Sequence, residues 1–230
     1  MCSRSAATHT KPVSLEPVAS WPYPPAPWQL QGSAVGSVFI VSVGSLPSAL
    51  FAHLPPGARL LGLGGYTLAV VGALHYGPGS DLEYEELLVA CPVRLNGRLH
   101  VTVGQIWVSS VPAAAGGREL WAVPKRLGAF TRRTAPGYVI TDLGSGSLHV
   151  SLLARVGRVG PPALRVPLTL AQFLDQQVGL SRCQIQGRPR RARVRWSFGS
   201  PGPLAWLEGR RPLLSLGLTR LRVVFGLPTD

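Results

Sequence analysis

Frequent glycine and proline are the feature that most constrains how this chain can fold. The 230 residues include 27 glycines and 22 prolines, about twice the usual share. Glycine weakens helices and proline interrupts them, so this high content of both favours short strands and turns over long helices. No Gly-x-y period accompanies these residues, which excludes a collagen-like chain. Apolar residues make up 46% and charged residues 14%, which is typical of a folded protein rather than a disordered one.

Hydrophobic periodicity predicts a mainly β fold with two or three short helices. Strands are expected at 33–43, 60–65, 66–74, 85–92, 99–103, 137–142, 148–156, 163–168, 184–198 and 213–225. Helices are expected at 46–54, 112–121 and 170–178. The loops are short and Asn96-Gly97 is a hairpin signal, so most strand pairs should be antiparallel. A barrel and a pair of packed sheets both fit this pattern.

The chain has no repeat or linker that would divide it. We expect residues 1–20 to form a flexible leader and residues 21–230 to form a single domain. The segment 21–28, WPYPPAPW, predicts an extended arm that packs its tryptophans on the domain. The uncharged segment 33–54 is diluted by glycine, proline and serine, which favours a strand and a short helix over a membrane span. Three cysteines without metal spacing and a start without a signal-peptide core favour a cytoplasmic location.

The positive charge of the chain does not by itself identify a partner. The formal net charge is +13, which fits nucleic acid, a membrane surface or an anionic substrate. Arg191, Arg193 and Arg195 alternate with less polar residues, which is typical of a strand with one face in water. No nucleic-acid-binding motif is present, and the five histidines are scattered. We therefore expect no nucleic-acid partner, no membrane partner and no metal site.

Lysine is almost absent from the sequence. Of the 23 basic residues, only Lys11 and Lys125 are lysines. Lys125 follows the apolar run 122–124, and Arg126 comes next. Burial and a neighbouring cation both disfavour an ammonium, and a neutral amine can attack a carbonyl to form a Schiff base, which a guanidinium cannot do. The alternative is an ordinary lysine whose stem lies on apolar surface and whose head is in water.

The residues around Lys125 resemble a known signature. The stretch 117–128, GRELWAVPKRLG, is similar to that of the acetoacetate decarboxylase family, roughly Gly-Arg-Glu-x-x-x-x-Pro-Lys-Lys-Leu-Gly. The stretches 84–93 and 96–97 resemble the preceding strand and hairpin of that family, and 27–30 resembles its N-terminal arm. The resemblance implies a mainly β fold, with a minor helical part: a cone-shaped antiparallel β-barrel with a flanking sheet and a few short helices.

The resemblance also implies catalytic residues. Lys125 matches the Schiff-base lysine of the family, and Glu86 matches a carboxylate of its active site. Arg126 stands where the family has a second lysine, and it keeps the positive charge that would hold the amine neutral. These three residues are the predicted catalytic residues.

Two departures from the family pattern concern substrate binding. Ser33 stands where the family has an arginine that engages the substrate carboxylate. Arg118 and Arg126 are the cations nearest in sequence to the lysine, and the charge of Arg126 is already assigned to the amine. Ser33, at the family position, and Arg118 are therefore the predicted substrate-binding residues. The family also has a second buried glutamate, near residues 68–71 of this chain, where no acid occurs. A more apolar substrate than acetoacetate is therefore expected.

The function implied by the resemblance is that of a Schiff-base lyase, a carboxy-lyase that decarboxylates a small β-keto acid. An aldolase or dehydratase that uses the same lysine iminium is the first alternative. A non-catalytic barrel that binds an apolar carbonyl compound is the second. The implied chemistry needs no metal or organic cofactor, and the resemblance implies a homo-oligomer.

Overall fold

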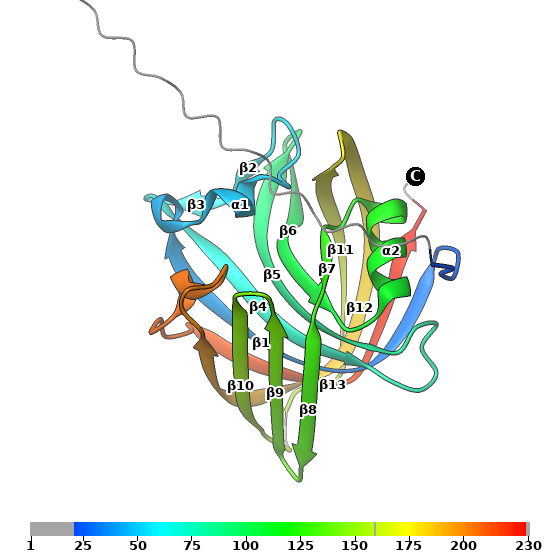
Figure 1. The fold of residues 1–230 in the computed structure, drawn as a ribbon, viewed down its shortest axis with the longest axis vertical. Helices are drawn as coiled ribbons and strands as arrows, with labels where there is room; N and C mark the ends of the chain where they lie inside the picture. The colour runs from blue at the N-terminus through cyan, green and yellow to red at the C-terminus, as the bar shows by residue number, and fades with distance from the viewer. Residues whose placement is uncertain (1–20, 159, 229–230) are drawn as a thin grey trace, which may run out of the picture.

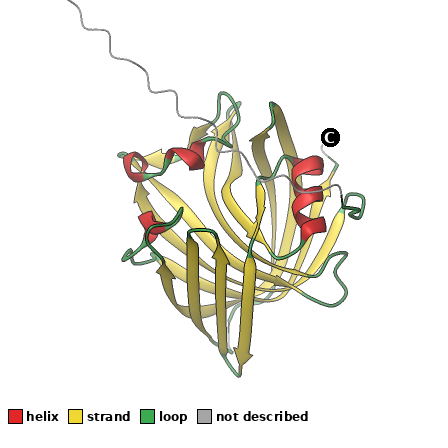
Figure 2. Ribbon diagram, viewed as in Figure 1, coloured by secondary structure: helices red, strands yellow, loops and turns green. Residues whose placement is uncertain are grey.

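The computed structural model describes residues 21–158 and 160–228, so the expected leader at 1–20 lies outside the described residues. Strands dominate this part of the chain and the helices lie at its periphery (Figure 2), as the sequence predicts. The helical elements are α1 (Ser48–Phe51), α2 (Val111–Trp121) and the short 3-10 turns Val43–Ser45 and Ala205–Leu207. Among the described residues, no helix has the length and apolar character that a membrane span requires.

Seven strands close into a barrel in the order β11, β6, β5, β4, β1, β13 and β12, and β12 pairs again with β11 (Figure 1). Their bounds are β1 (Trp28–Ser42), β4 (Tyr66–Tyr76), β5 (Tyr84–Leu95), β6 (Arg98–Val108), β11 (Leu164–Leu174), β12 (Gln177–Phe198) and β13 (Leu214–Leu227). Short strands extend this barrel: β2 (Arg59–Leu60) pairs with β5, β3 (Gly62–Leu63) with β4, and β7 (Lys125–Leu127) with β6.

A flanking sheet covers one side of the barrel. It consists of β8 (Ala129–Ala135), β9 (Tyr138–Ser145) and β10 (Leu148–Val156). These three strands lie in the lower part of the view in Figure 1. The barrel and this sheet share β12, whose last residues pair antiparallel with β10. The predicted cone-shaped barrel with a flanking sheet is therefore present.

Strand alternation divides the apolar residues into two cores. On β5, Tyr84 and Ala90 belong to the cluster inside the barrel. Leu87 and Val89 belong to a second cluster, which includes Leu152 and other residues of β9 and β10 and so lies between the barrel and the flanking sheet. Because successive side chains point to opposite faces of a strand, neighbouring residues of β5 serve different cores.

A buried glutamine closes the barrel where main-chain pairing is sparse. Strands β6 and β11 are parallel and share a single registered pair. The Gln172 side chain is fully buried and bridges them: its Oε1 accepts from Thr102 Oγ1 at 2.8 Å and from Val103 N at 3.0 Å, and its Nε2 donates to Val103 O at 3.0 Å. Leaving such a buried amide unpaired would cost about 1–3 kcal/mol.

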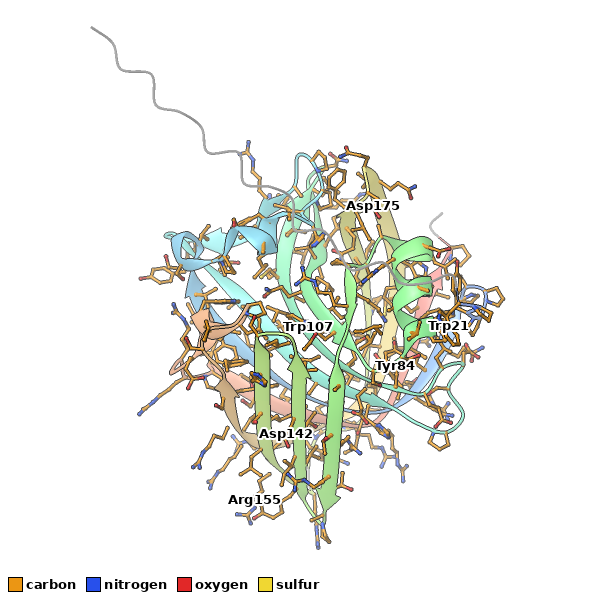
Figure 3. All side chains as sticks on the ribbon, viewed as in Figure 1. Trp21, Tyr84, Trp107, Asp142, Arg155 and Asp175 are labelled. Atoms are coloured by element: carbon orange, nitrogen blue, oxygen red, sulfur yellow. The ribbon has the colours of Figure 1, made fainter. Side chains whose placement is uncertain are left out.

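The helix predicted at 170–178 is wrong. Residues 164–174 and 177–198 instead form the hairpin of β11 and β12, with Asp175 at its tip (Figure 3). Asp175 and Gln176 make the turn with φ values of 49° and 64°, the left-handed conformation of a two-residue hairpin loop. The apolar spacing of LAQFLDQQV fits a helix as well as a strand, and pairing with both neighbours decides the outcome.

Candidate active site

The barrel encloses an almost entirely apolar cavity of ≈ 310 Å³. Its only charged lining residues among those described are Lys125 and Glu86. The other lining residues are Trp28, Leu30, Ala34, Val70, Leu74, Tyr76, Tyr84, Leu88, Ala90, Val101, Val103, Ile106, Trp121, Val123, Leu168, Leu170, Cys183, Ile185, Leu218, Leu221, Val223 and Phe225. A cavity of this size is in the range of small-molecule sites.

The Lys125 amine has two polar partners in this cavity. Its Nζ donates to Glu86 Oε2 at 3.0 Å and to the Tyr84 hydroxyl at 3.1 Å. Lys125 is 7% exposed and Glu86 is 5% exposed, so water screens this pair little. The Nζ also lies 4.9 Å from the centre of the Tyr84 ring and 5.9 Å from that of Trp28. The amine, a carboxylate and a phenol thus meet at one point of an apolar wall.

The other titratable groups in the cavity wall stay protonated at neutral pH. Burial, with the nearby Glu86 carboxylate, raises the pKa of Tyr84 and of Tyr76 well above the usual value for a tyrosine. Burial and Glu86 also raise the pKa of the Cys183 thiol to about 12. The remaining titratable groups of this wall are Lys125 and Glu86, and their side chains are hydrogen-bonded to each other.

Helix α2 explains why the signature holds Gly117, Arg118 and Glu119. A Cβ at Gly117 would lie 2.6 Å from Lys125 Cδ, so the glycine leaves room for the lysine stem. Arg118 Nε donates to the Lys125 carbonyl at 2.7 Å and holds the backbone of the lysine. Glu119 Oε2 accepts from the Tyr23 hydroxyl at 2.6 Å, which fastens the N-terminal arm. Gly117 and Arg118 thus position Lys125, and Glu119 holds the N-terminal arm against α2.

Gly117→Ala should lower the rate of Schiff-base formation about 100-fold. The added methyl group has to displace the lysine stem, and a shift of about 1 Å in a reacting group can cost that much. The helix itself should be unharmed, because alanine favours a helix more than glycine does. Borohydride trapping at several times measures the rate, and Leu120→Ala on the same helix is the control. An unchanged rate in Gly117→Ala would show that the amine position tolerates this contact.

Arg126 does not face the amine. Its guanidinium lies 5.9 Å from the centre of the Trp107 ring, which belongs to the core outside the barrel. On β7, Lys125 registers with Ile106 and Arg126 with Trp107, so the two side chains point to opposite faces. Burial lowers the pKa of Arg126 from its usual value. The charged group in contact with the amine is the Glu86 carboxylate, and the Arg126 guanidinium lies on the other side of the strand.

The two predicted substrate-binding residues do not line the Lys125 cavity. Ser33 registers with His75, whereas the next residue, Ala34, registers with Leu74 and lines the cavity. Ser33 thus points away from the barrel interior, where its Oγ accepts from Arg132 Nη2 at 3.3 Å. Arg118 binds main chain, as described above. The structure therefore brings Lys125 and Glu86 together and leaves Ser33, Arg118 and Arg126 outside.

The absence of a second glutamate is visible in the wall. Val70, in the 68–71 region, lines the cavity and registers with Ala90 of β5. At this position the cavity wall is aliphatic on both β4 and β5. The cavity therefore lacks two polar groups of the family pattern: the arginine that engages the substrate carboxylate and the second glutamate.

Sequence reasoning missed Tyr84 and Trp28 as site residues. Tyr84 stands two residues before Glu86 on the same strand, so strand alternation places both on one face, and that signal was available in the sequence. Trp28 packs edge-on against Trp121 with ring centres 4.6 Å apart. The arm was expected to pack both of its tryptophans on the domain, but only Trp28 is buried and enters the barrel, whereas Trp21 is 51% exposed. Tyr84 and Trp28 form the wall around the amine.

Comparisons with known proteins agree with this geometry. The family model described as acetoacetate decarboxylase (ADC) matches residues 10–158. The chain belongs to the acetoacetate decarboxylase family. A search of curated proteins found no match.

Solved structures of this family share the fold. An acetoacetate decarboxylase aligns with a TM-score of 0.62 at 18% identity, covering 92% of this chain and 91% of the other. The acetoacetate decarboxylase of Legionella pneumophila subsp. pneumophila str. Philadelphia 1 aligns with a TM-score of 0.58 at 18% identity, covering 96% and 95%. The enduracididine biosynthesis enzyme MppR, complexed with pyruvate, aligns with a TM-score of 0.59 at 18% identity, covering 91% of each chain.

The described residues include no group of three or more His, Cys, Asp and Glu side chains placed to hold a metal ion. The polar groups around Lys125 are one carboxylate and phenol hydroxyls. This donor set serves proton transfer to and from an amine, which is the chemistry that a Schiff base requires.

Proposed function

We propose that this protein is an enzyme that forms a Schiff base between Lys125 and a ketone, and that it decarboxylates a β-keto acid. The observation that carries the proposal is the buried Lys125 amine, 3.0 Å from Glu86 Oε2 and 3.1 Å from the Tyr84 hydroxyl, in an apolar cavity. Family membership supports it, because a lysine with this signature is present at the matching place.

The contact with Glu86 supplies the free amine. An ammonium and a carboxylate 3.0 Å apart become an amine and a carboxylic acid by one proton transfer, with no change in net charge and no proton exported to water. The amine of Lys125 then adds to the ketone carbon. The acid form of Glu86 returns its proton to the carbinolamine oxygen, which leaves as water and gives the iminium.

The iminium drives the loss of carbon dioxide. The carbon–carbon bond to the carboxylate breaks, its electron pair moves into the new enamine, and the iminium nitrogen becomes neutral. Protonation of the enamine carbon regenerates an iminium, and water attacks it to release the ketone and free Lys125. Glu86, or a water that it binds, supplies and takes up these protons, and the Tyr84 hydroxyl holds the nitrogen in place by a hydrogen bond.

The cavity favours a keto acid with an apolar chain over acetoacetate. Among the described residues, no arginine lines it, so no guanidinium is in place to pair with a substrate carboxylate. Such a charged pair typically contributes about 1.5–3 kcal/mol. Apolar side chains at Val70, Leu74 and Leu168 instead offer surface to an alkyl chain, at about 0.8 kcal/mol per buried methylene group.

A panel of β-keto acids tests the reaction and the substrate class together. We expect carbon dioxide release with kcat/KM at least tenfold higher for 3-oxooctanoate than for acetoacetate. Ser33→Arg should leave the acetoacetate value unchanged, because Ser33 points away from the cavity. A kcat/KM for acetoacetate near 10⁴ M⁻¹s⁻¹ or above, together with no preference for the longer chain, would contradict the proposed substrate class.

An aldolase or dehydratase reaction is the second candidate. The same iminium can lose a proton to give an enamine that adds to an aldehyde. The related MppR has been obtained with the condensation product of pyruvate and imidazole 4-carboxaldehyde, at a TM-score of 0.54 and 19% identity. Schiff-base trapping without carbon dioxide release would favour this candidate. No trapping with any carbonyl compound would favour the non-catalytic barrel.

The predicted homo-oligomer remains part of the proposal. Exposed apolar side chains lie next to one another on β1 and β4: Ile40 is 52% exposed and registers with Leu68, which is 39% exposed. Paired apolar residues of this kind are typical of a surface that another molecule covers. A cytoplasmic location likewise stays a prediction from the sequence.

A further inference from the structure

A second cavity, of ≈ 420 Å³, lies between the barrel and the flanking sheet. Unlike the Lys125 cavity it has many polar lining residues, and they come from both layers. They include Glu85, Arg132, Thr134, Tyr138, Arg158 and Arg190. Three arginines against a single carboxylate give this lining a net positive charge, even with His75 neutral.

Arg132 is a largely enclosed cation of this lining, with its side chain 21% exposed. Strand β8 alternates, so Arg132 points inward while its neighbour Arg133 is 68% exposed and pairs with Asp142 at 3.5 Å. The side chain of Arg133 belongs to the outer surface of the flanking sheet, on which Figure 3 labels Asp142. Because of this alternation, Arg132 lines the cavity and Arg133 lies in solvent.

The hydrogen-bond capacity of Arg132 is only partly used. A guanidinium has five N–H donors. Among the described residues, Nη2 of Arg132 donates to Ser33 Oγ at 3.3 Å, and Nε lies 3.9 Å from Glu85 Oε2, too far for a hydrogen bond. Glu85 is engaged elsewhere, because its Oε1 lies 2.6 Å from His75 Nδ1. Arg132 therefore presents free donors to the cavity, arranged to fit a planar or tetrahedral oxyanion.

We propose that this cavity binds a small oxyanion, the carboxylate or phosphate group of a metabolite, with Arg132 as its principal ligand. Arg190 and Arg158 add positive charge to the lining. Thr134 and Tyr138 also line the cavity, and a hydroxyl group can donate a hydrogen bond to an oxyanion. The ligand would take the place of water at those guanidinium donors that the described residues leave unused.

This site is distinct from the Lys125 cavity. Ser33, His75 and Glu85 register side by side on β1, β4 and β5, on the face opposite to Glu86. Ala34, Leu74 and Leu218 border both cavities and form the wall between them. An anion on Arg132 would therefore bind across this wall from the amine, and its binding does not depend on Schiff-base chemistry.

Calorimetric titration of the full chain with inorganic phosphate and, separately, with succinate tests the proposal. Ionic strength is held constant with sodium chloride. We expect saturable binding of at least one anion to wild-type protein and to Lys125→Gln, and at least tenfold weaker binding to Arg132→Gln. The matched control Arg133→Gln should bind as the wild type does. The two probes distinguish a phosphate ligand from a carboxylate ligand.

Two outcomes would overturn the proposal: no saturable binding of either anion to wild-type protein, or equal losses in Arg132→Gln and Arg133→Gln. If Arg132→Gln does not fold, Arg190→Gln and Thr134→Val decide, because both residues line the same cavity. Unchanged affinity in both of these variants would place the anion elsewhere. Binding to Lys125→Gln keeps this result separate from the fate of the proposed enzymatic function.

Discussion

Exchanging Lys125 and Arg126, in the double variant Lys125→Arg/Arg126→Lys, is expected to reduce turnover to the uncatalysed rate. The exchange keeps the composition and charge of the chain but moves the amine to the other face of β7, next to Trp107. A guanidinium would then occupy the Lys125 position, and it does not deprotonate to attack a carbonyl. Carbon dioxide release from a β-keto acid measures the loss, and the thermal midpoint reports whether the fold is kept.

The single variant Arg126→Lys is the control for this exchange. It retains Lys125 in the cavity and a cation on the outer face, so we expect activity within a few-fold of the wild type. Turnover by the exchanged protein at a rate like that of Arg126→Lys would contradict the assignment of Lys125, because the amine would then act from the wrong side of the strand.

Glu86→Gln is expected to lower kcat about 10²- to 10⁴-fold, the usual contribution of general acid–base catalysis. Glutamine keeps the size of the side chain and a hydrogen bond to the Lys125 Nζ, but it cannot take up or return a proton. Borohydride trapping of the amine should be slowed as well, because the acid form of Glu86 is no longer present to protonate the departing carbinolamine oxygen. Glu86→Asp, which restores a carboxylate, should recover part of the lost kcat, and this rescue separates a lost proton carrier from a merely distorted wall.

Glu85→Gln is the matched control, because Glu85 is the next residue on β5 and points to the opposite face, toward His75. Its kcat should stay within a few-fold of the wild type. Equal losses in Glu85→Gln and Glu86→Gln would indicate a general effect on β5, and the proposed proton transfer at the amine would then have no support.

The pairing of Lys125 with Glu86 could be predicted from the sequence, but their surroundings only in part. The rarity of lysine and the Gly-Arg-Glu to Pro-Lys signature pointed to Lys125, and the resemblance pointed to Glu86. The strand period could also have placed Tyr84 beside Glu86 and turned Ser33 away from the barrel, since Trp28 and Leu30 face inward on the same strand. The assignment of Ser33 to substrate binding follows from the resemblance alone, and the strand period places its side chain on the opposite face.

Other features depend on contacts between distant segments. Gly117 and Arg118 have roles that become clear only when α2 lies against Lys125. The hairpin of β11 and β12 reads as a helix locally, because its partners on β6 and β13 are far away in sequence. The sequence does not distinguish Arg132 from Arg133. Only the packing of the flanking sheet against the barrel encloses the Arg132 side chain.

Borohydride reduction in the presence of a keto acid, followed by peptide mass spectrometry, tests the central claim most directly. The account predicts one adduct, of the mass of the reduced keto compound, on the peptide that contains Lys125, and none on the peptide that contains Lys11. The adduct should disappear in Lys125→Arg while the protein stays folded. An adduct of equal yield in Lys125→Arg, or no adduct on the wild type with acetoacetate, 3-oxooctanoate or pyruvate, would contradict the account.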